Sequence, residues 1–249
     1  MKDKKATALS AAITSAINLA TMALSESTAH VVSAISPIVQ LAIERGLSTI
    51  GPNRLSEREK YRVGSAVWWA SKVAEDNIRA GRRVSQQQFE QDDLTALVES
   101  LFRAASEDSQ EKKDMAYGAF LGNFAFQDQF DGGALFAMAR ILKDLSFDEL
   151  LLMASLDGRP GMNYESFYKK LDQEGDLRCG EMIGYFIRLR NFGLTVRVAP
   201  ITLGSNIGNL KLSALGEALC HMAMLGELDP EQLESLRGYL NLFAKPAGI

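Results

Sequence analysis

The chain has 249 residues, of which 27 are basic and 31 acidic, so its formal net charge is −4. This length suits one large domain or two small ones, and the charge excludes a globally basic surface for nucleic acid or anionic lipid. The two cysteines and two histidines are too few for a disulfide framework or for a zinc site without carboxylates. Composition therefore excludes disulfide scaffolds, zinc fingers and collagen, and it suits a reducing cytoplasm.

The first segment, Ala6–Ser25, contains no charged residue and predicts a packed helix. Its stronger apolar residues recur every three or four positions, so they share one stripe, with small hydroxyl side chains on the other face. Such a face suits close packing, either within the fold or between copies of the chain. A second helix is predicted from Pro37 to about Gly46. The residues expected to carry self-association are Leu9, Ile13, Ile17 and Leu24.

Membrane contact through residues 6–43 is a further alternative, because the uncharged run is about as long as a bilayer requires. The many Ser, Thr and Ala residues in this run argue against both a membrane-spanning helix and a signal peptide. We therefore expect a cytoplasmic protein.

A long helix is predicted to start at the capping box formed by Ser56 and Glu59 and to end near Gly81. The adjacent residues Trp68 and Trp69 point about 100° apart on such a helix, so at least one should lie at a helix boundary or partner surface. The residues predicted to form the buried stripe are Val63, Ala66, Val67, Ala70, Val73, Ala74 and Ile78.

Three further helices complete the expected N-terminal bundle. One spans Leu94–Ala105 and begins either at a capping box over residues 85–88 or with Asp92 as N-cap. The next runs over about residues 109–126, where Gly118 and Gly122 would allow a neighbouring helix to approach closely. A shorter helix follows Asp131. The aromatic residues of this region are expected to be core rather than a cofactor site.

The C-terminal segment begins with another capping box, Ser146 to Glu149, and continues with helices around residues 164–171 and 177–191. An alternating strand over residues 194–198, a loop, a strand over 210–212 and a helix over 213–224 follow. A last helix begins at Asp229-Pro230 and should bury Leu233, Leu236, Leu240 and Phe243.

This order is typical of a winged helix-turn-helix. The predicted fold is therefore mainly α, with a helical bundle over residues 1–145 and a winged-helix-like domain with a short β-hairpin over residues 146–249. A winged helix raises the question of DNA binding, which needs cations at phosphates.

The candidate nucleic-acid contacts are Arg178, Arg188, Arg190 and Arg197. Residues 146–249 hold 13 Asp and Glu against 10 Lys and Arg, so this half is itself slightly acidic. Four arginines could serve only in a dimer, and Arg188 and Arg190 also complement the C-terminal dipole of their own helix. We therefore favour a winged helix that binds protein and keep a dimeric DNA-binding regulator as the alternative.

No nucleotide-binding, hydrolase, metalloprotease or EF-hand motif occurs in the chain. The neighbours Cys220 and His221 diverge by about 100° on a helix, so they do not make a nucleophile–base pair, and Cys220 should pack in the core. A solvated acidic face is expected for Glu99, Glu107, Asp108, Glu111 and Asp114. No catalytic residue, metal or cofactor is predicted, and the chain is expected not to be an enzyme.

Residues 58–84 (REKYRVGSAVWWASKVAEDNIRAGRRV) and 111–126 (EKKDMAYGAFLGNFAF) resemble uncharacterised bacterial helical proteins of the Abi-alpha type, which is associated with abortive infection and phage defence. The resemblance covers about residues 55–155 and carries no catalytic residue. It implies a bacterial or prophage-encoded cytoplasmic protein that acts through assembly. The leading expectation is thus a non-enzymatic, oligomeric interaction protein. A membrane-active effector that releases its N-terminal helices is a third alternative.

Overall fold

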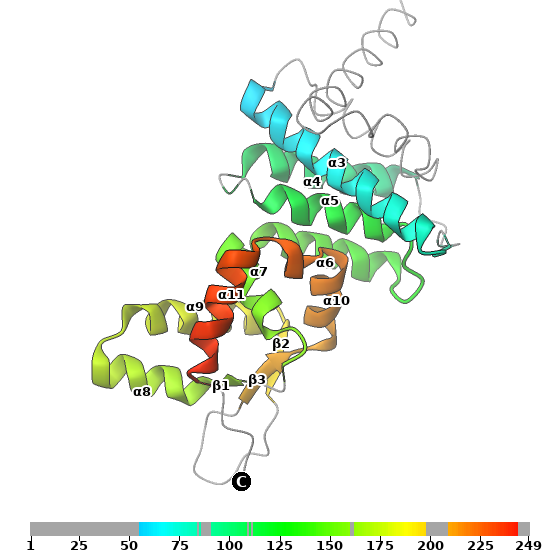
Figure 1. Ribbon diagram of the computed structural model, residues 1–249. Coiled ribbons are helices and arrows are strands. Elements are labelled where there is room, and N and C mark those ends of the chain that lie inside the picture. Colours follow the sequence, from blue (N-terminus) through cyan, green and yellow to red (C-terminus); the bar gives the residue numbers. More distant parts are fainter. Residues whose placement is uncertain are drawn as a thin grey trace, which may run out of the picture. The chain divides into compact units, whose positions relative to one another are not determined.

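The computed structural model describes residues 55–83, 85, 91–108, 110, 112–159, 162–197 and 209–243, with the backbone alone for 91–92, 163–166 and 209. The chain divides into two compact units, Met1–Asp144 and Leu145–Ile249. The described residues are mainly helical (Figure 1), as the sequence predicts. The helix stripe of Leu9, Ile13, Ile17 and Leu24 and the helix from Pro37 lie outside the described residues.

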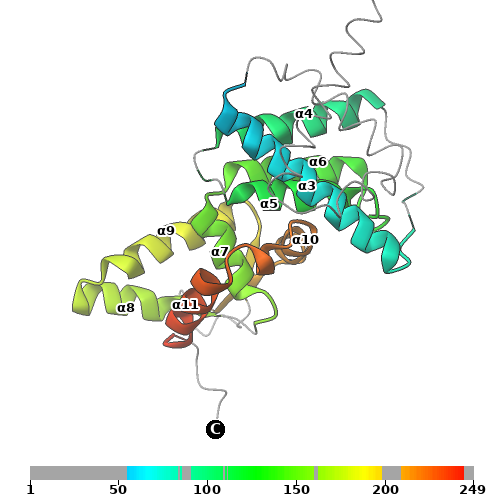
Figure 2. The ribbon, with the colours of Figure 1, turned by 45° about the horizontal axis from the view of Figure 1, so that its top comes forward.

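In its described part, the N-terminal unit consists of helices that pack on one another (Figures 1 and 2). They are α3 (Glu57–Arg79), α4 (Gln91–Glu107), α5 (Lys113–Phe124) and α6 (Gly132–Asp144).

Helix α3 starts where the sequence predicts. The hydroxyl of Ser56 accepts a hydrogen bond from the backbone N–H of Glu59, and the Glu59 carboxylate accepts one from the N–H of Ser56 at 2.6 Å. The helix ends at Arg79, and Gly81 follows with φ of +75°, a conformation that glycine adopts without strain. The predicted capping box is therefore confirmed.

The buried stripe of α3 is confirmed over all but its last residue. Ile78 is 38% exposed, whereas its neighbour Asn77 is buried. Asn77 turns inward because the end of the helix is held by polar contacts: its Nδ2 donates to Asn123 Oδ1 at 2.9 Å, and Arg82 donates to Asn77 Oδ1 at 2.7 Å. Arg82 also donates to the carbonyl of Phe126. This polar clamp replaces the expected apolar contact.

Helix α5 is buried along its whole length, because its apolar residues surround the helix instead of forming one stripe. Its two glycines meet the backbone of α3. A Cβ at Gly118 would lie 2.3 Å from the carbonyl oxygen of Ala66, and one at Gly122 would lie 2.6 Å from that of Ala70. The close approach predicted for Gly118 and Gly122 is therefore confirmed.

Both tryptophans of α3 are half-buried. The rings of Trp68 and Trp69 meet edge to face with centroids 4.7 Å apart, and the Lys72 ammonium lies 5.2 and 4.8 Å from the two centroids. Neither ring reaches the centre of the core, as their 100° divergence predicts.

The expected solvated acidic face is wrong for Asp114, which is buried, and for Asp108, which is paired with Lys113. Lys113 and Asp114 are 3% and 2% exposed, and the Lys113 ammonium lies 2.6 Å from the Asp108 carboxylate. The hydroxyl of Tyr117 donates to the same carboxylate at 2.9 Å. Lys113 at the start of α5 is thus paired with a carboxylate from the segment before the helix, which lowers the cost of burying its charge.

The pKa of Asp108 reflects this network. Burial pushes the pKa up, but hydrogen bonds from Lys113, from the N–H of Gln110 and from Tyr117, together with the Lys113 charge, hold it below its ordinary value. Burial and the nearby carboxylates raise the pKa of Tyr117.

Two helix starts also differ from expectation. Helix α4 begins at Gln91, so Asp92 lies within its first turn and is not the N-cap. Helix α5 begins at Lys113, four residues later than predicted, since Asp108 accepts a hydrogen bond from the N–H of Gln110 in the preceding turn.

The described part of the C-terminal unit combines helices with a small antiparallel sheet. Its elements are α7 (Phe147–Leu156), β1 (Met162–Asn163), α8 (Tyr164–Glu174), α9 (Leu177–Asn191), β2 (Thr195–Arg197), β3 (Asn209–Leu212), α10 (Ala214–Met222), the 3-10 turn η4 (Leu225–Glu227) and α11 (Pro230–Asn241).

Strand β3 lies in the middle of the sheet, in the order β1-β3-β2. Val196 pairs with Lys211 on one side, and Met162 pairs with Leu210 on the other. Strand β2 falls within the predicted segment, and β3 begins one residue before the predicted one. Strand β1 is not in the prediction, because two residues are too short to show an alternating pattern.

Helix α7 forms the centre of this unit and contacts α9, α10 and α11 (Figure 2). Its capping box is confirmed, with the Glu149 carboxylate accepting from the N–H of Ser146 at 2.7 Å. Every residue of α7 is buried except Asp148. The prediction for α11 is also confirmed, since the residues expected to be inward are all buried: Leu233, Leu236, Leu240 and Phe243.

Candidate functional site

Helix α9 is the element from which the candidate site is built. Its N-cap is Asp176, whose carboxylate accepts from the N–H of Arg178 at 3.0 Å, and its bounds are those predicted. One face of the helix is buried in the unit, through Cys179, Met182, Ile183, Phe186 and Leu189. The opposite face and the two flanks reach solvent, and three of the predicted nucleic-acid arginines lie there.

Arg188 is half-exposed and forms an ion pair with a buried residue of its own unit. Its Nε lies 3.0 Å from Oε1 of Glu149, whose side chain is fully buried. The same carboxylate caps α7 by accepting from the N–H of Ser146, so it contacts both the start of that helix and Arg188. Arg188 therefore has a structural role that the sequence did not reveal, beyond the predicted position in the last turn of α9.

Arg178 lies against an aromatic ring. Its guanidinium carbon is 4.2 Å from the ring centroid of Tyr239 in α11, within the range of a cation–π contact. The Tyr239 hydroxyl is 3.0 Å from the sulfur of Cys179 and donates to the Asp176 carboxylate at 3.4 Å. Arg178 thus links α9 to α11.

The two cysteines are not placed for nucleophilic chemistry. Burial is the main cause of a raised pKa at Cys179, and burial also raises the pKa of Cys220. Both thiols are buried and free, whereas His221 is exposed on the neighbouring face, as predicted. A thiol that resists deprotonation is a poor nucleophile.

Arg190 and Arg197 are exposed, on α9 and β2, and no described residue forms an ion pair with either. The four predicted arginines therefore do not share one environment. Two are bound within the unit, and two are available to a partner.

The exposed surface of α9 is mixed: two large apolar side chains lie on it together with Glu181, Arg190 and Asn191. Leu177 is 81% exposed and Ile187 is 46% exposed, and Gly184 between them has no neighbouring atom within 4 Å of a Cβ position. Val196 on β2 is also exposed. Large apolar side chains at the surface are typical of a contact with another protein.

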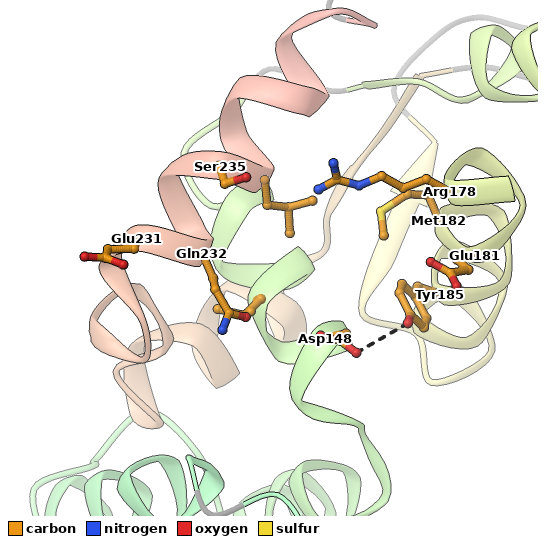
Figure 3. Close-up of a pocket in the computed structure, with 10 residues that line it drawn as sticks. Asp148, Arg178, Glu181, Met182, Tyr185, Glu231, Gln232 and Ser235 are labelled. Atoms are coloured by element: carbon orange, nitrogen blue, oxygen red, sulfur yellow. Dashed lines mark hydrogen bonds between the residues drawn. The ribbon is translucent and has the colours of Figure 1, made fainter. Parts of the chain in front are cut away.

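A cleft of about 370 Å³ lies between α7, α9 and α11 of the same unit (Figure 3). Its floor is apolar and comes from Leu151, Met182 and Leu236, each of which is buried. Its remaining lining is polar: Asp148, Arg178, Glu181, Tyr185, Glu231, Gln232 and Ser235.

The two ends of the cleft differ in charge. Figure 3 shows Asp148 and Glu181 beside Tyr185 at one end, Arg178 at the other end, and the Glu231 carboxylate turned away on the outer side of α11. The Tyr185 hydroxyl donates to Asp148 over 3.5 Å. Burial raises the pKa of Tyr185, and the charges of Asp148, Glu181 and Glu149 raise it further. The tyrosine end is therefore electrically negative.

This cleft was not predicted from the sequence, because its residues come from three helices that are far apart in the chain. Asp148 and Glu231 each lie in the first turn of a capped helix. An acidic residue is common there because it interacts favourably with the helix dipole, so neither residue indicated a binding site. The one available signal was Glu181, an acidic residue amid the arginines of α9.

Within the described residues, no three or more His, Cys, Asp and Glu side chains gather closely enough to hold a metal ion. No helix in the same residues is both long and apolar enough to cross a bilayer.

The fold defines a class only in general terms, a mainly helical protein whose C-terminal unit carries a small antiparallel sheet. Comparisons with family models, curated proteins and solved structures give no match. The resemblance to the Abi-alpha type stays a prediction.

Proposed function

We propose that this chain is a non-enzymatic interaction protein and that its C-terminal unit is a winged-helix-like module that binds another protein through α9. One observation carries the proposal. The outward face of α9 presents Leu177, Gly184 and Ile187, while Arg178 and Arg188 are engaged within the unit.

The winged-helix interpretation is supported by the order of elements. The unit runs helix, strand, helix, helix, strand, strand from α7 to β3, and β3 pairs with both other strands. In a winged helix of this order, α9 would occupy the recognition position. The exposed Val196 on β2 would then add to the apolar side chains exposed on α9.

Protein binding is favoured over DNA binding by the side chains that α9 exposes. Base edges are read by hydrogen-bonding side chains, above all Arg, Lys, Asn and Gln, and phosphates need cations. The outward part of α9 offers Arg190 and Asn191 for these roles, and it also exposes the apolar side chains of Leu177 and Ile187. Apolar side chains gain more from contact with a protein than with phosphates.

Photo-crosslinking tests the protein-binding face. The full chain would carry benzoylphenylalanine at position 187 in a bacterial host, with position 242 as the control because Leu242 is also apolar and exposed, just after the end of α11. We expect a discrete crosslinked partner, or a second copy, from position 187, and its loss with Leu177→Glu. Equal crosslinking from both positions would contradict the proposal.

A DNA-binding regulator remains the second candidate because Arg190 and Arg197 are exposed and have no described ion-pair partner. Fluorescence anisotropy with a mixed-sequence 30-base-pair duplex at 50 mM salt separates the two functions. The protein-binding proposal expects dissociation constants weaker than about 100 μM, the weak end of non-specific binding. Micromolar affinity that falls with Arg190→Ala and Arg197→Ala would favour the regulator instead.

The proposal includes self-association through the stripe of Leu9, Ile13, Ile17 and Leu24, which follows from the sequence alone. Light scattering of the full chain and of a variant lacking residues 6–25 tests it. We expect an oligomer that dissociates in the shortened chain, and a monomer in both samples would contradict it.

A role in phage defence rests on the resemblance of residues 58–84 and 111–126 to the Abi-alpha type. Expression in a bacterial host should lower plaque counts for some phages, and Ile187→Glu should restore them. Unchanged plaque counts across a broad phage panel would remove this part of the proposal. No observation on the described residues favours the membrane-active alternative.

A further inference from the structure

We propose that the cleft between α7, α9 and α11 binds the side chain of a lysine or arginine from a basic segment of the partner protein. This inference rests on the proposed function and names the chemistry of the partner. Three features carry it: the apolar floor, the negative end, and the lack of an ion pair between that end and any residue that the structure describes.

The size and floor of the cleft fit a long aliphatic stem. A volume of about 370 Å³ holds one long side chain together with part of its backbone, and it falls in the range of ligand sites. Lysine and arginine side chains bury their methylene groups against apolar surface and leave the charged end at a polar boundary. Leu151, Met182 and Leu236 supply that apolar surface.

The negative end fits the charged group. Asp148 and Glu181 come from different helices and lie beside the ring of Tyr185, so a cation there would meet two carboxylates and an aromatic ring (Figure 3). Arg178 stands at the opposite end and is held by Tyr239. The bound side chain would therefore point its charge away from Arg178, which fixes its direction.

The carboxylates of the cleft are not neutralised by the fold. Neither Asp148, Glu181 nor Glu231 forms an ion pair with a described residue, whereas the nearby Glu149 is paired with Arg188. Like charges around an unfilled cleft repel one another, and a bound cation would relieve this repulsion. An organic cation is favoured over a metal ion, since no group of carboxylates in the described residues is close enough to coordinate one.

Fluorescence anisotropy with short labelled peptides tests the inference on the full chain. The probe is fluorescein-Gly-Ser-Leu-Arg-Ser-Gly-amide, with matched peptides that carry lysine, norleucine or glutamate in place of the arginine. We expect the arginine and lysine peptides to bind at least about tenfold more tightly than the norleucine peptide, because the norleucine side chain keeps the stem and lacks the charge. Equal binding of the norleucine peptide would overturn the proposal.

A pair of double variants separates the cleft from general attraction to an acidic protein. Asp148→Asn with Glu181→Gln removes the negative end, and Asp172→Asn with Glu217→Gln makes the same change in net charge at exposed positions outside the cleft lining. We expect the cleft pair to weaken arginine-peptide binding about tenfold and the control pair less than about twofold. Equal losses in the two pairs would overturn the proposal. Circular dichroism would confirm that both variants stay folded.

Two further experimental outcomes separate this inference from other ligands and from the proposed function. Added spermidine should displace the peptide only weakly if the cleft is shaped for a side chain. Displacement by spermidine at a concentration equal to that of the peptide would assign the site to free polyamines instead. If the peptides fail to bind while position 187 still crosslinks to a partner, then the cleft inference is wrong and the proposed function stands.

Discussion

Replacing Gly118 with alanine tests whether the contact between α5 and α3 sets the stability of the N-terminal unit. The added Cβ would lie 2.3 Å from the Ala66 carbonyl oxygen and 2.6 Å from the Trp69 Cβ, distances at which neither group can remain in place. Both obstacles are backbone or Cβ atoms, so rotation of a flexible side chain cannot relieve the clash. The two helices would have to move apart.

The magnitude follows from two opposed effects. Overpacking of a close contact costs about 3 kcal/mol at the upper end of its usual range, and alanine gains about 1 kcal/mol over glycine within a helix. We therefore expect Gly118→Ala to lower the free energy of unfolding by about 2 kcal/mol. At Gly184 in α9 nothing lies within 4 Å of a Cβ position, so Gly184→Ala should stabilise its own unit by about 0.5–1 kcal/mol.

Tryptophan fluorescence is the suitable probe for urea unfolding of both variants. The two tryptophans of the chain, Trp68 and Trp69, both lie in α3, so their emission follows the N-terminal unit. We expect the midpoint to fall for Gly118→Ala and to stay unchanged for Gly184→Ala. A midpoint that rises for Gly118→Ala would refute the close contact between α3 and α5.

The remaining predictions concern charges and thiols. Arg188→Ala leaves the buried Glu149 carboxylate without its cation and should lower the free energy of unfolding of the C-terminal unit by about 1–2 kcal/mol. This value is below that of a fully buried pair because Arg188 is half-exposed. The control variant Arg190→Ala should change the free energy of unfolding by less than about 0.5 kcal/mol. Urea unfolding followed by circular dichroism measures both, and equal effects would contradict the structural role of Arg188. Because folding lowers the pKa of Asp108, its ionised carboxylate stabilises the folded N-terminal unit at every pH above the ordinary carboxyl pKa of about 4. This stabilisation is lost as the pH falls through the lowered pKa of the folded state. In the Lys113→Met variant, the stability of the N-terminal unit should therefore depend less on pH in the acid range, as followed by tryptophan fluorescence. The same dependence on pH in the variant and the original chain would count against the ion pair. Burial raises the pKa of Cys220, so iodoacetamide at pH 8 should alkylate this thiol only as fast as the C-terminal unit opens. Mass spectrometry measures the labelling, and rapid labelling of the native chain would contradict the burial of Cys220.

Local patterns allowed much of the secondary structure to be predicted. The capping boxes at Ser56 and Ser146 mark helix starts correctly, because capping depends on residues within a single turn. The close approach at Gly118 was also predictable, since two glycines one turn apart have few other uses inside an apolar helix.

Contacts between distant segments could not be predicted. The Arg188–Glu149 ion pair joins residues far apart in the chain, and each of them has a sufficient local explanation, one as a dipole partner and the other as a cap. The burial of Lys113 with Asp108 was missed for a similar reason, because a run of charged residues ordinarily faces water. The cleft depends on the same kind of distant contact.

The burial of every residue of α7 except Asp148 limits how the cleft can change during evolution. Leu151 forms its floor and also fills the core, so a substitution there would alter the stability of the whole unit along with the shape of the cleft. Glu181 and Gln232 lie on the exposed walls, where most substitutions are tolerated. Variation among descendants of this chain should therefore accumulate on α9 and α11, and new specificities would arise on these walls above an unchanging floor.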